Sequence, residues 1–195
     1  MVKQSFPGGF PSATLKPLSK MLCDAVGYLH KRRIVHRDIK PENVLVSDSL
    51  TSLWLADFNT AYQLMDGWAL TMTGTRDYSA PEVLQDESPS EKADIWSLGL
   101  SLHFMAVGKL PRRLGDFQDL SAFCAAVLKP VQFSQPEWHP IDESFKAILR
   151  RCLAIEKSAR PASMELLQSA FFQELMESEN EDNDDLAAVC RTRSV

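Results

Sequence analysis

Apolar residues recur at helical spacing after a turn-rich start in residues 1–13, which we expect to be irregular. The recurring positions are Leu15, Leu18, Leu22, Ala25, Val26 and Leu29. Intervals of three and four place them on one face of a helix. This helix is predicted to end near residues 30–33, where four basic-type side chains would lie at the negative end of its dipole. Ile34 and Val35 follow, and a polar loop comes next.

Two short β-rich runs, residues 44–46 and 53–56, lie on either side of a polar turn. This arrangement predicts a β-hairpin. Because the hairpin directly follows the polar loop, it would bring side chains before and after it to one side of the molecule.

Helical patterns dominate the rest of the chain. Residues 95–110 are the most apolar run, but polar residues interrupt them and the run is too short for a bilayer, so we predict a buried helix. A weak helix is predicted over 120–128, a further helical face over 145–153, and a last turn and helix over 159–171. From about Glu177 onward, low hydrophobicity and crowded acids indicate disorder.

Composition and charge are ordinary for one soluble globular domain with a tail. The 195 residues are 45% apolar and 24% charged, with a net charge of −5. Residues 174–185 carry seven acids and no base, and two arginines follow in residues 186–195. Without both groups the net charge is zero. A neutral body does not support nucleic-acid binding, and the acidic tail favours solubility over docking of a basic partner.

The four cysteines are far apart and form no C-x-x-C pair, so neither a metal knuckle nor a disulfide framework is predicted. Reduced thiols suit the cytosol or nucleus. The first 20 residues contain no apolar core of a signal peptide. We therefore expect a cytoplasmic or nuclear protein without a membrane partner.

The candidate chemistry lies in residues 36–43, His-Arg-Asp-Ile-Lys-Pro-Glu-Asn, and in the triplet Asp57-Phe58-Asn59, which begins 19 residues after Asp38. A single polar loop residue is usually only a solvated one, but this ordered set resembles the catalytic loop and metal-binding motif of a protein kinase. Lys40, two residues after the aspartate, is the serine/threonine form. Phosphoryl transfer requires positioning and charge neutralisation more than covalent work by the protein.

The resemblance implies a role for each site residue. Asp38 would accept the proton of the substrate hydroxyl and orient its oxygen, while Lys40 would neutralise the transferring phosphate. Asn43 and Asp57 would be oxygen ligands of Mg²⁺. Leu45 would form the floor under the adenine ring of ATP, although the pattern alone explains it equally well as a core residue.

Other residues of the two motifs would have supporting roles. His36 and Phe58 would pack together and join the two loops. Arg37 would be the socket for a phosphorylated activation loop. Thr71 and Thr73 are candidate phosphosites because Arg37 needs an anionic partner, but both also fit ordinary loop hydroxyls.

Residues 60–75 are expected to form a short linker to residues 74–82, Gly-Thr-Arg-Asp-Tyr-Ser-Ala-Pro-Glu, which are similar to the kinase segment that seats the substrate residue. Thr75 would hydrogen-bond Asp38 and Lys40, as in the serine/threonine type.

Buried polar contacts are also implied. Glu82 would form a buried ion pair with Arg160, because an unpaired buried carboxylate is costly. Asp94, near the start of the apolar helix, would bind the backbone of the catalytic loop from below. His30 would be a packing residue at a helix end with no catalytic role.

Asn59 departs from the family pattern, which usually has glycine where the backbone must turn freely. Asn tolerates the left-handed region better than most residues, so the metal-binding turn is expected to survive.

The resemblance covers roughly residues 12–173 and matches only the C-terminal lobe of a kinase. The expected fold is mainly α, a kinase-like C-terminal lobe with a small β-hairpin at the catalytic loop. We expect three parts, which are an irregular segment 1–13, the partial kinase domain 14–173 and the tail 174–195. No G-x-G-x-x-G loop, strand lysine or partner glutamate precedes residue 36. The surface near Leu45 and Phe58 would then be an exposed apolar patch prone to association.

Two functions follow from the resemblance. The first is a serine/threonine protein kinase that transfers phosphate from ATP to protein substrates, truncated and with little activity alone. The alternative is a non-catalytic, pseudokinase-like binding or regulatory module. The partners implied are a protein substrate, ATP and a regulatory protein or upstream kinase, with no nucleic acid.

Overall fold

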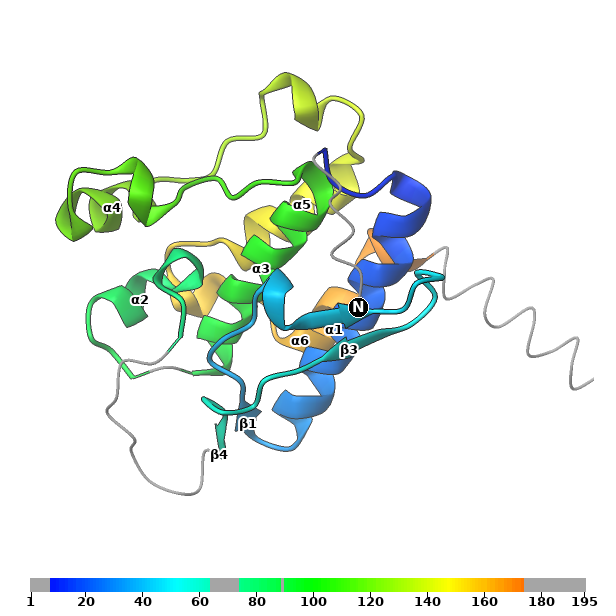
Figure 1. The fold of residues 1–195 in the computed structure, drawn as a ribbon, viewed down its shortest axis with the longest axis horizontal. Helices are drawn as coiled ribbons and strands as arrows, with labels where there is room; N and C mark the ends of the chain where they lie inside the picture. Colours follow the sequence, from blue (N-terminus) through cyan, green and yellow to red (C-terminus); the bar gives the residue numbers. More distant parts are fainter. Residues whose placement is uncertain (1–7, 64–73, 89, 174–195) are drawn as a thin grey trace, which may run out of the picture.

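The computed structural model describes residues 8–63, 74–88 and 90–173, which form a mostly helical fold with two small sheets (Figure 1). The helices are α1 (Ser12–Lys31), α2 (Pro81–Leu84), α3 (Glu91–Val107), α4 (Leu120–Val127), α5 (Glu143–Cys152) and α6 (Ser163–Leu167). The strands are β1 (Ile34–Val35), β2 (Val44–Val46), β3 (Leu53–Leu55) and β4 (Tyr62–Gln63). The prediction of a mainly α fold is therefore confirmed.

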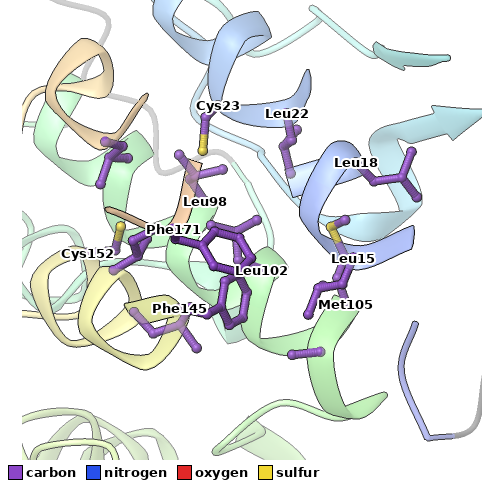
Figure 2. Packing of buried hydrophobic residues seen from close by; sticks show 14 of the residues in the cluster. Leu15, Leu18, Leu22, Cys23, Leu98, Leu102, Met105, Phe145, Cys152 and Phe171 are labelled. Atoms are coloured by element: carbon purple, nitrogen blue, oxygen red, sulfur yellow. The ribbon is translucent and has the colours of Figure 1, made fainter. Parts of the chain in front are cut away.

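Helix α3 lies at the centre of the bundle, with α1 and α5 packed beside it and α6 packed on α1 (Figure 1). Figure 2 shows the core between these helices, where Leu22 of α1, Leu98 and Leu102 of α3 and Phe145 of α5 are buried together. Burial of these apolar side chains is the main favourable contribution to folding. The helical faces predicted from residue spacing are the faces that form this core.

The apolar stretch predicted as a buried helix is α3. At Gly99 a Cβ atom would lie 2.7 Å from the Cβ of Cys152, so glycine permits the close approach of α5. Gly108 ends the helix in the left-handed region with φ 71°, and its N–H donates to the carbonyl of Phe104 at 2.7 Å. Within the described residues, every helix is too short or too polar to cross a bilayer.

The predicted hairpin is present as β2 and β3, which are antiparallel in the register Val44↔Leu55, Leu45↔Trp54 and Val46↔Leu53. The linker prediction is wrong at residues 62–63. They form β4, which pairs antiparallel with β1 in the register Ile34↔Gln63 and Val35↔Tyr62. A strand of two residues shows no alternation from which sequence could identify it.

The ends of the elements differ little from expectation. Helix α1 begins at Ser12, inside the segment that we expected to be irregular. The predicted helix over 120–128 is α4, and the face over 145–153 is α5. The acidic tail, for which disorder is predicted, lies outside the described residues.

Arg160 is a buried cation that joins three parts of the fold. Its guanidinium donates to both carboxylate oxygens of Glu82, at 2.7 and 2.8 Å, which confirms the predicted ion pair. The same group donates to the carbonyls of Lys92, Ala154 and Ile155. The five N–H groups of the guanidinium thus have acceptors within the protein, and the segment before α6 is fixed to α2 and α3.

We predict that Arg160→Met lowers the free energy of unfolding by about 3–5 kcal/mol, because it leaves the Glu82 carboxylate buried without its partner. Urea unfolding followed by circular dichroism measures the loss. Lys157→Met is the control, since its ion pair with Glu87 is exposed and its loss should leave the midpoint almost unchanged. Equal midpoints for the Arg160 variant and the wild type would contradict the prediction.

Candidate active site

The buried carboxylate of Asp94 fixes the start of the polar loop of residues 36–43 to the central helix. Its two oxygens accept hydrogen bonds from the backbone N–H groups of His36, at 2.8 Å, and Arg37, at 2.9 Å. Oδ2 also lies 3.0 Å from Nε2 of His30. The expected contact between Asp94 and the loop backbone is confirmed. The role of His30 as a second partner of Asp94 goes beyond the packing role expected from sequence.

His36 connects the loop of residues 36–43 to the segment after β3. Its Nε2 lies 3.1 Å from the carbonyl oxygen of Ala56, and its ring meets that of Phe58 edge-on with centroids 4.9 Å apart. The Ala56 N–H donates to the carbonyl of Asn43 at 2.8 Å. Thr60, which sequence reasoning did not single out, donates from its hydroxyl to the carbonyl of His36 at 2.9 Å. A lone threonine in a loop gives no sequence signal of such a contact.

The Asp38 carboxylate is the centre of a hydrogen-bonded cluster. Lys40 Nζ donates to its Oδ2 at 2.7 Å, and Asn43 Nδ2 donates to the same oxygen at 3.0 Å. Oδ1 accepts from the backbone N–H of Thr75 at 2.9 Å and from its hydroxyl at 3.0 Å. Lys40 also donates to the Thr75 hydroxyl at 2.6 Å. The structure thus brings these four predicted site residues into direct contact.

These contacts determine the protonation of Asp38. Burial acts to raise its pKa, but the hydrogen bonds from Lys40, Thr75 and Asn43 and the charge of Lys40 outweigh burial and lower the pKa below its ordinary value of 3.8. Asp38 is therefore ionised at neutral pH. It is an oriented acceptor rather than a strong base.

The residues expected at the magnesium site fit that ion chemically. Asn43 donates through Nδ2, at 2.8 Å to the backbone carbonyl of Asp38, and this bond does not use its amide oxygen, which is the atom that can coordinate a cation. The exposed carboxylate of Asp57 lies one residue beyond Ala56, whose backbone is bonded to that of Asn43. One carboxylate and one amide oxygen suit Mg²⁺, which keeps several waters and phosphate oxygens as ligands.

The conformation of the Asp57 turn explains why Asn59 is compatible with it. The residue in the left-handed region is Asp57, with φ 62°, and Asn59 is not among the described residues with positive φ. The Asn59 N–H lies 3.4 Å from Asp57 Oδ1. The freedom of glycine that we expected at this position is therefore not used.

Arg37, the expected socket for a phosphorylated activation loop, contacts residues 60–62. Its Nε donates to the carbonyl of Thr60, and its guanidinium lies 5.1 Å from the centre of the Tyr62 ring. Its Nη1 is buried without a hydrogen-bond partner in the described part of the chain. The candidate phosphosites Thr71 and Thr73 lie outside the described residues, so the phosphate socket stays a prediction.

The apolar surface expected above the loop has a larger member than sequence reasoning named. Phe58 is 48% exposed and Leu45 is half-buried, but Trp54, opposite Leu45 on β3, is 56% exposed. Association through this surface remains a prediction.

The chain is similar to known proteins of one family. A family model described as protein kinase domain matches residues 3–172. The chain is 35% identical over 164 residues to the serine/threonine-protein kinase DCLK1 of Rattus norvegicus, an alignment that covers 82% of this chain and 37% of that protein. It is 34% identical over 166 residues to the calcium/calmodulin-dependent protein kinase cmkA of Emericella nidulans, covering 83% and 39%.

The chain therefore belongs to the protein kinase domain family. A third relative is the calcium/calmodulin-dependent protein kinase type I of Schizosaccharomyces pombe, which is 32% identical over 173 residues, or 86% of this chain and 51% of that protein. The chain thus spans between about a third and a half of the length of these relatives.

We predict that Asp94→Ala lowers the free energy of unfolding by about 2–5 kcal/mol, because it leaves the N–H groups of His36 and Arg37 without their acceptors. Amide hydrogen exchange at these two residues should accelerate. Asp119→Ala is the control, since it removes only the cap that accepts from Ala122 N–H on α4 and should not change exchange in the loop. Unchanged protection of both amides in Asp94→Ala would refute the anchoring role.

We predict that Lys40→Met raises the pKa of Asp38, because burial then acts with less compensation. Titration of the Asp38 carboxyl carbon by NMR measures the shift, and Lys20→Met, which removes an exposed pair with Asp24, is the control. The wild-type pKa is depressed, so Asp38 adds stability above pH 3.8, which is lost as the pH falls through its folded-state pKa. A lower or unchanged pKa in Lys40→Met would show that Lys40 does not stabilise the ionised carboxylate.

Proposed function

We propose that this chain carries the phosphotransfer site of a serine/threonine protein kinase that uses ATP and Mg²⁺. The observation that supports this most strongly is the Asp38 carboxylate, held on both oxygens by Lys40, Asn43 and Thr75. Lys40 contacts both the Asp38 carboxylate and the Thr75 hydroxyl, so two separate segments meet at this carboxylate. This arrangement suits a site that must orient a hydroxyl beside a highly charged phosphate.

In this proposal Asp38 binds the hydroxyl of a serine or threonine on the substrate protein and directs its oxygen toward the terminal phosphate. As the hydroxyl oxygen bonds to the terminal phosphorus, the bond from that phosphorus to the bridging oxygen breaks and ADP leaves. With a lowered pKa, Asp38 is a weak base, so it takes the hydroxyl proton when the forming bond has made that proton acidic. Lys40 lies between Asp38 and Thr75 and neutralises charge on the transferring group. Asn43 and Asp57 would hold Mg²⁺, which neutralises phosphate oxygens when it is bound.

The chain on its own is expected to orient ATP poorly. Protein kinases position the triphosphate with a Gly-rich loop and a strand lysine, and neither pattern occurs in residues 1–35. Orientation of bound reactants can supply about 7–11 kcal/mol of a catalysed barrier. Loss of even half of this contribution would slow transfer by several orders of magnitude.

A second candidate is a non-catalytic module that keeps the kinase shape to bind partners or compete with a complete kinase. Asn59, at a position where the family usually has glycine, is compatible with such a module. The intact set of Asp38, Lys40, Asn43 and Asp57 favours kinase function, because a module freed from catalysis has no need to retain all four.

We predict that the 195-residue chain, assayed alone with Mg·ATP and a generic protein substrate, turns over more than about 1,000-fold more slowly than the ~1–100 s⁻¹ of ordinary kinases. Transfer of radiolabelled phosphate measures this rate. Any residual activity should disappear in Asp38→Ala and persist in Asp48→Ala, an exposed aspartate of the hairpin turn.

The outcomes separate the candidates. An ordinary kinase rate that Asp38→Ala abolishes would contradict the low activity but support the site. A rate that is the same in Asp38→Ala would contradict the site itself. Calorimetric titration with Mg·ATP gives the second test, since the non-catalytic module predicts no binding that depends on Asp57.

A further inference from the structure

The middle rung of the β2–β3 hairpin faces away from the helical core. Val44, Val46, Leu53 and Leu55, which form the two outer rungs, all pack against the buried core. Successive side chains of a strand point to opposite faces, and residues paired across antiparallel strands share a face. The middle pair, Leu45 and Trp54, therefore lies together on the opposite face.

This rung lies next to the candidate magnesium ligands. Leu45 is two residues after Asn43 on one strand, and Trp54 is three residues before Asp57 on the other. The hydrogen bond from Ala56 N–H to the Asn43 carbonyl fixes the two ends of the hairpin against each other. On each strand, the apolar rung is thus only two or three residues away from a residue that would meet the phosphates.

We propose that Trp54 is a nucleotide-binding residue, whose indole ring contacts the adenine base beside Leu45. This inference rests on the proposed function, because it needs ATP bound over β2 and β3. A large aromatic ring that is 56% exposed beside a half-buried leucine offers an apolar surface of the kind on which a base stacks. Trp54 would set affinity and base preference and take no part in phosphoryl transfer.

The position of Trp54 predicts a preference for purine over pyrimidine nucleotides as well as an affinity for ATP. A purine presents a larger ring to the indole than a pyrimidine, so ATP should bind more tightly than CTP. Replacement of the indole by a methyl group should weaken ATP binding more than CTP binding and so reduce the difference between them.

Calorimetric titration of the full chain with Mg·ATP tests the affinity. Trp54→Ala should raise the Kd about 5- to 20-fold, the cost of one lost stacking contact, while Trp54→Phe should stay within about twofold of the wild type. Tyr28→Ala is a matched control, because Tyr28 is also 56% exposed but lies on α1, where its ring meets the Arg32 guanidinium at 3.6 Å. It should leave the Kd unchanged.

NMR of the indole N–H groups gives an independent readout that does not require phosphate binding. The resonance absent from the Trp54→Phe spectrum is that of Trp54. Adenosine should shift it in the wild type and in Asp57→Ala, whereas inorganic tripolyphosphate with Mg²⁺ should not. Circular dichroism should show that Trp54→Ala unfolds at the same temperature as the wild type, since the side chain is outside the core.

Each outcome separates this inference from the proposed function. If the wild type binds Mg·ATP and Trp54→Ala binds it equally well, the inference is wrong and the kinase site stands. If Trp54→Ala weakens binding but adenosine does not shift the Trp54 resonance, the indole acts only on the hairpin, and the inference is again overturned. If neither Mg·ATP nor adenosine binds, both the nucleotide site and the role of Trp54 are refuted.

Discussion

The site depends on the buried carboxylate of Asp94, which accepts hydrogen bonds from two backbone N–H groups. Ile39 fixes the loop of residues 36–43 to the apolar core, but most of the other side chains in this loop are polar, so hydrophobic burial alone does not fix its backbone. A charged acceptor on the most buried helix supplies that hold, because hydrogen bonds to charged groups are stronger than those between neutral groups. This contact fixes residues 36 and 37, which directly precede Asp38.

The site therefore has two layers with different physics. Below, α1, α3 and α5 meet through close-packed apolar side chains, and Gly99 lets α3 and α5 approach. Above, polar contacts connect segments far apart in sequence, as between Asp38 and Thr75. The apolar core is a rigid support for the polar contacts, and the hydrogen bonds orient the side chains of the site. Trp54 and Leu45 lie on the face of the hairpin opposite the core.

Sequence was sufficient for the long helices and the hairpin, because periodicity is a local signal, and the family resemblance implied the contacts of Thr75 with Asp38 and Lys40. The bonds from Lys40 and Asn43 to Asp38 were found only in the structure. Sequence was insufficient for the pairing of β1 with β4, since strands of two residues show no period. It also missed Thr60 and the bond from His30 to Asp94, which arise only when distant segments meet. The exposure of Trp54 required the register of the hairpin, because a tryptophan in an apolar run is equally compatible with a buried position.

The ion pair of Glu82 with Arg160 has a consequence for how the protein is made. The two residues are 78 positions apart, so a nascent chain leaving the ribosome exposes the glutamate long before its arginine has been synthesised. Until then, the region around α2 cannot bury that carboxylate without the cost of an isolated charge. Helix α1 can form earlier. The region around α2 can complete its packing only after translation has passed residue 160.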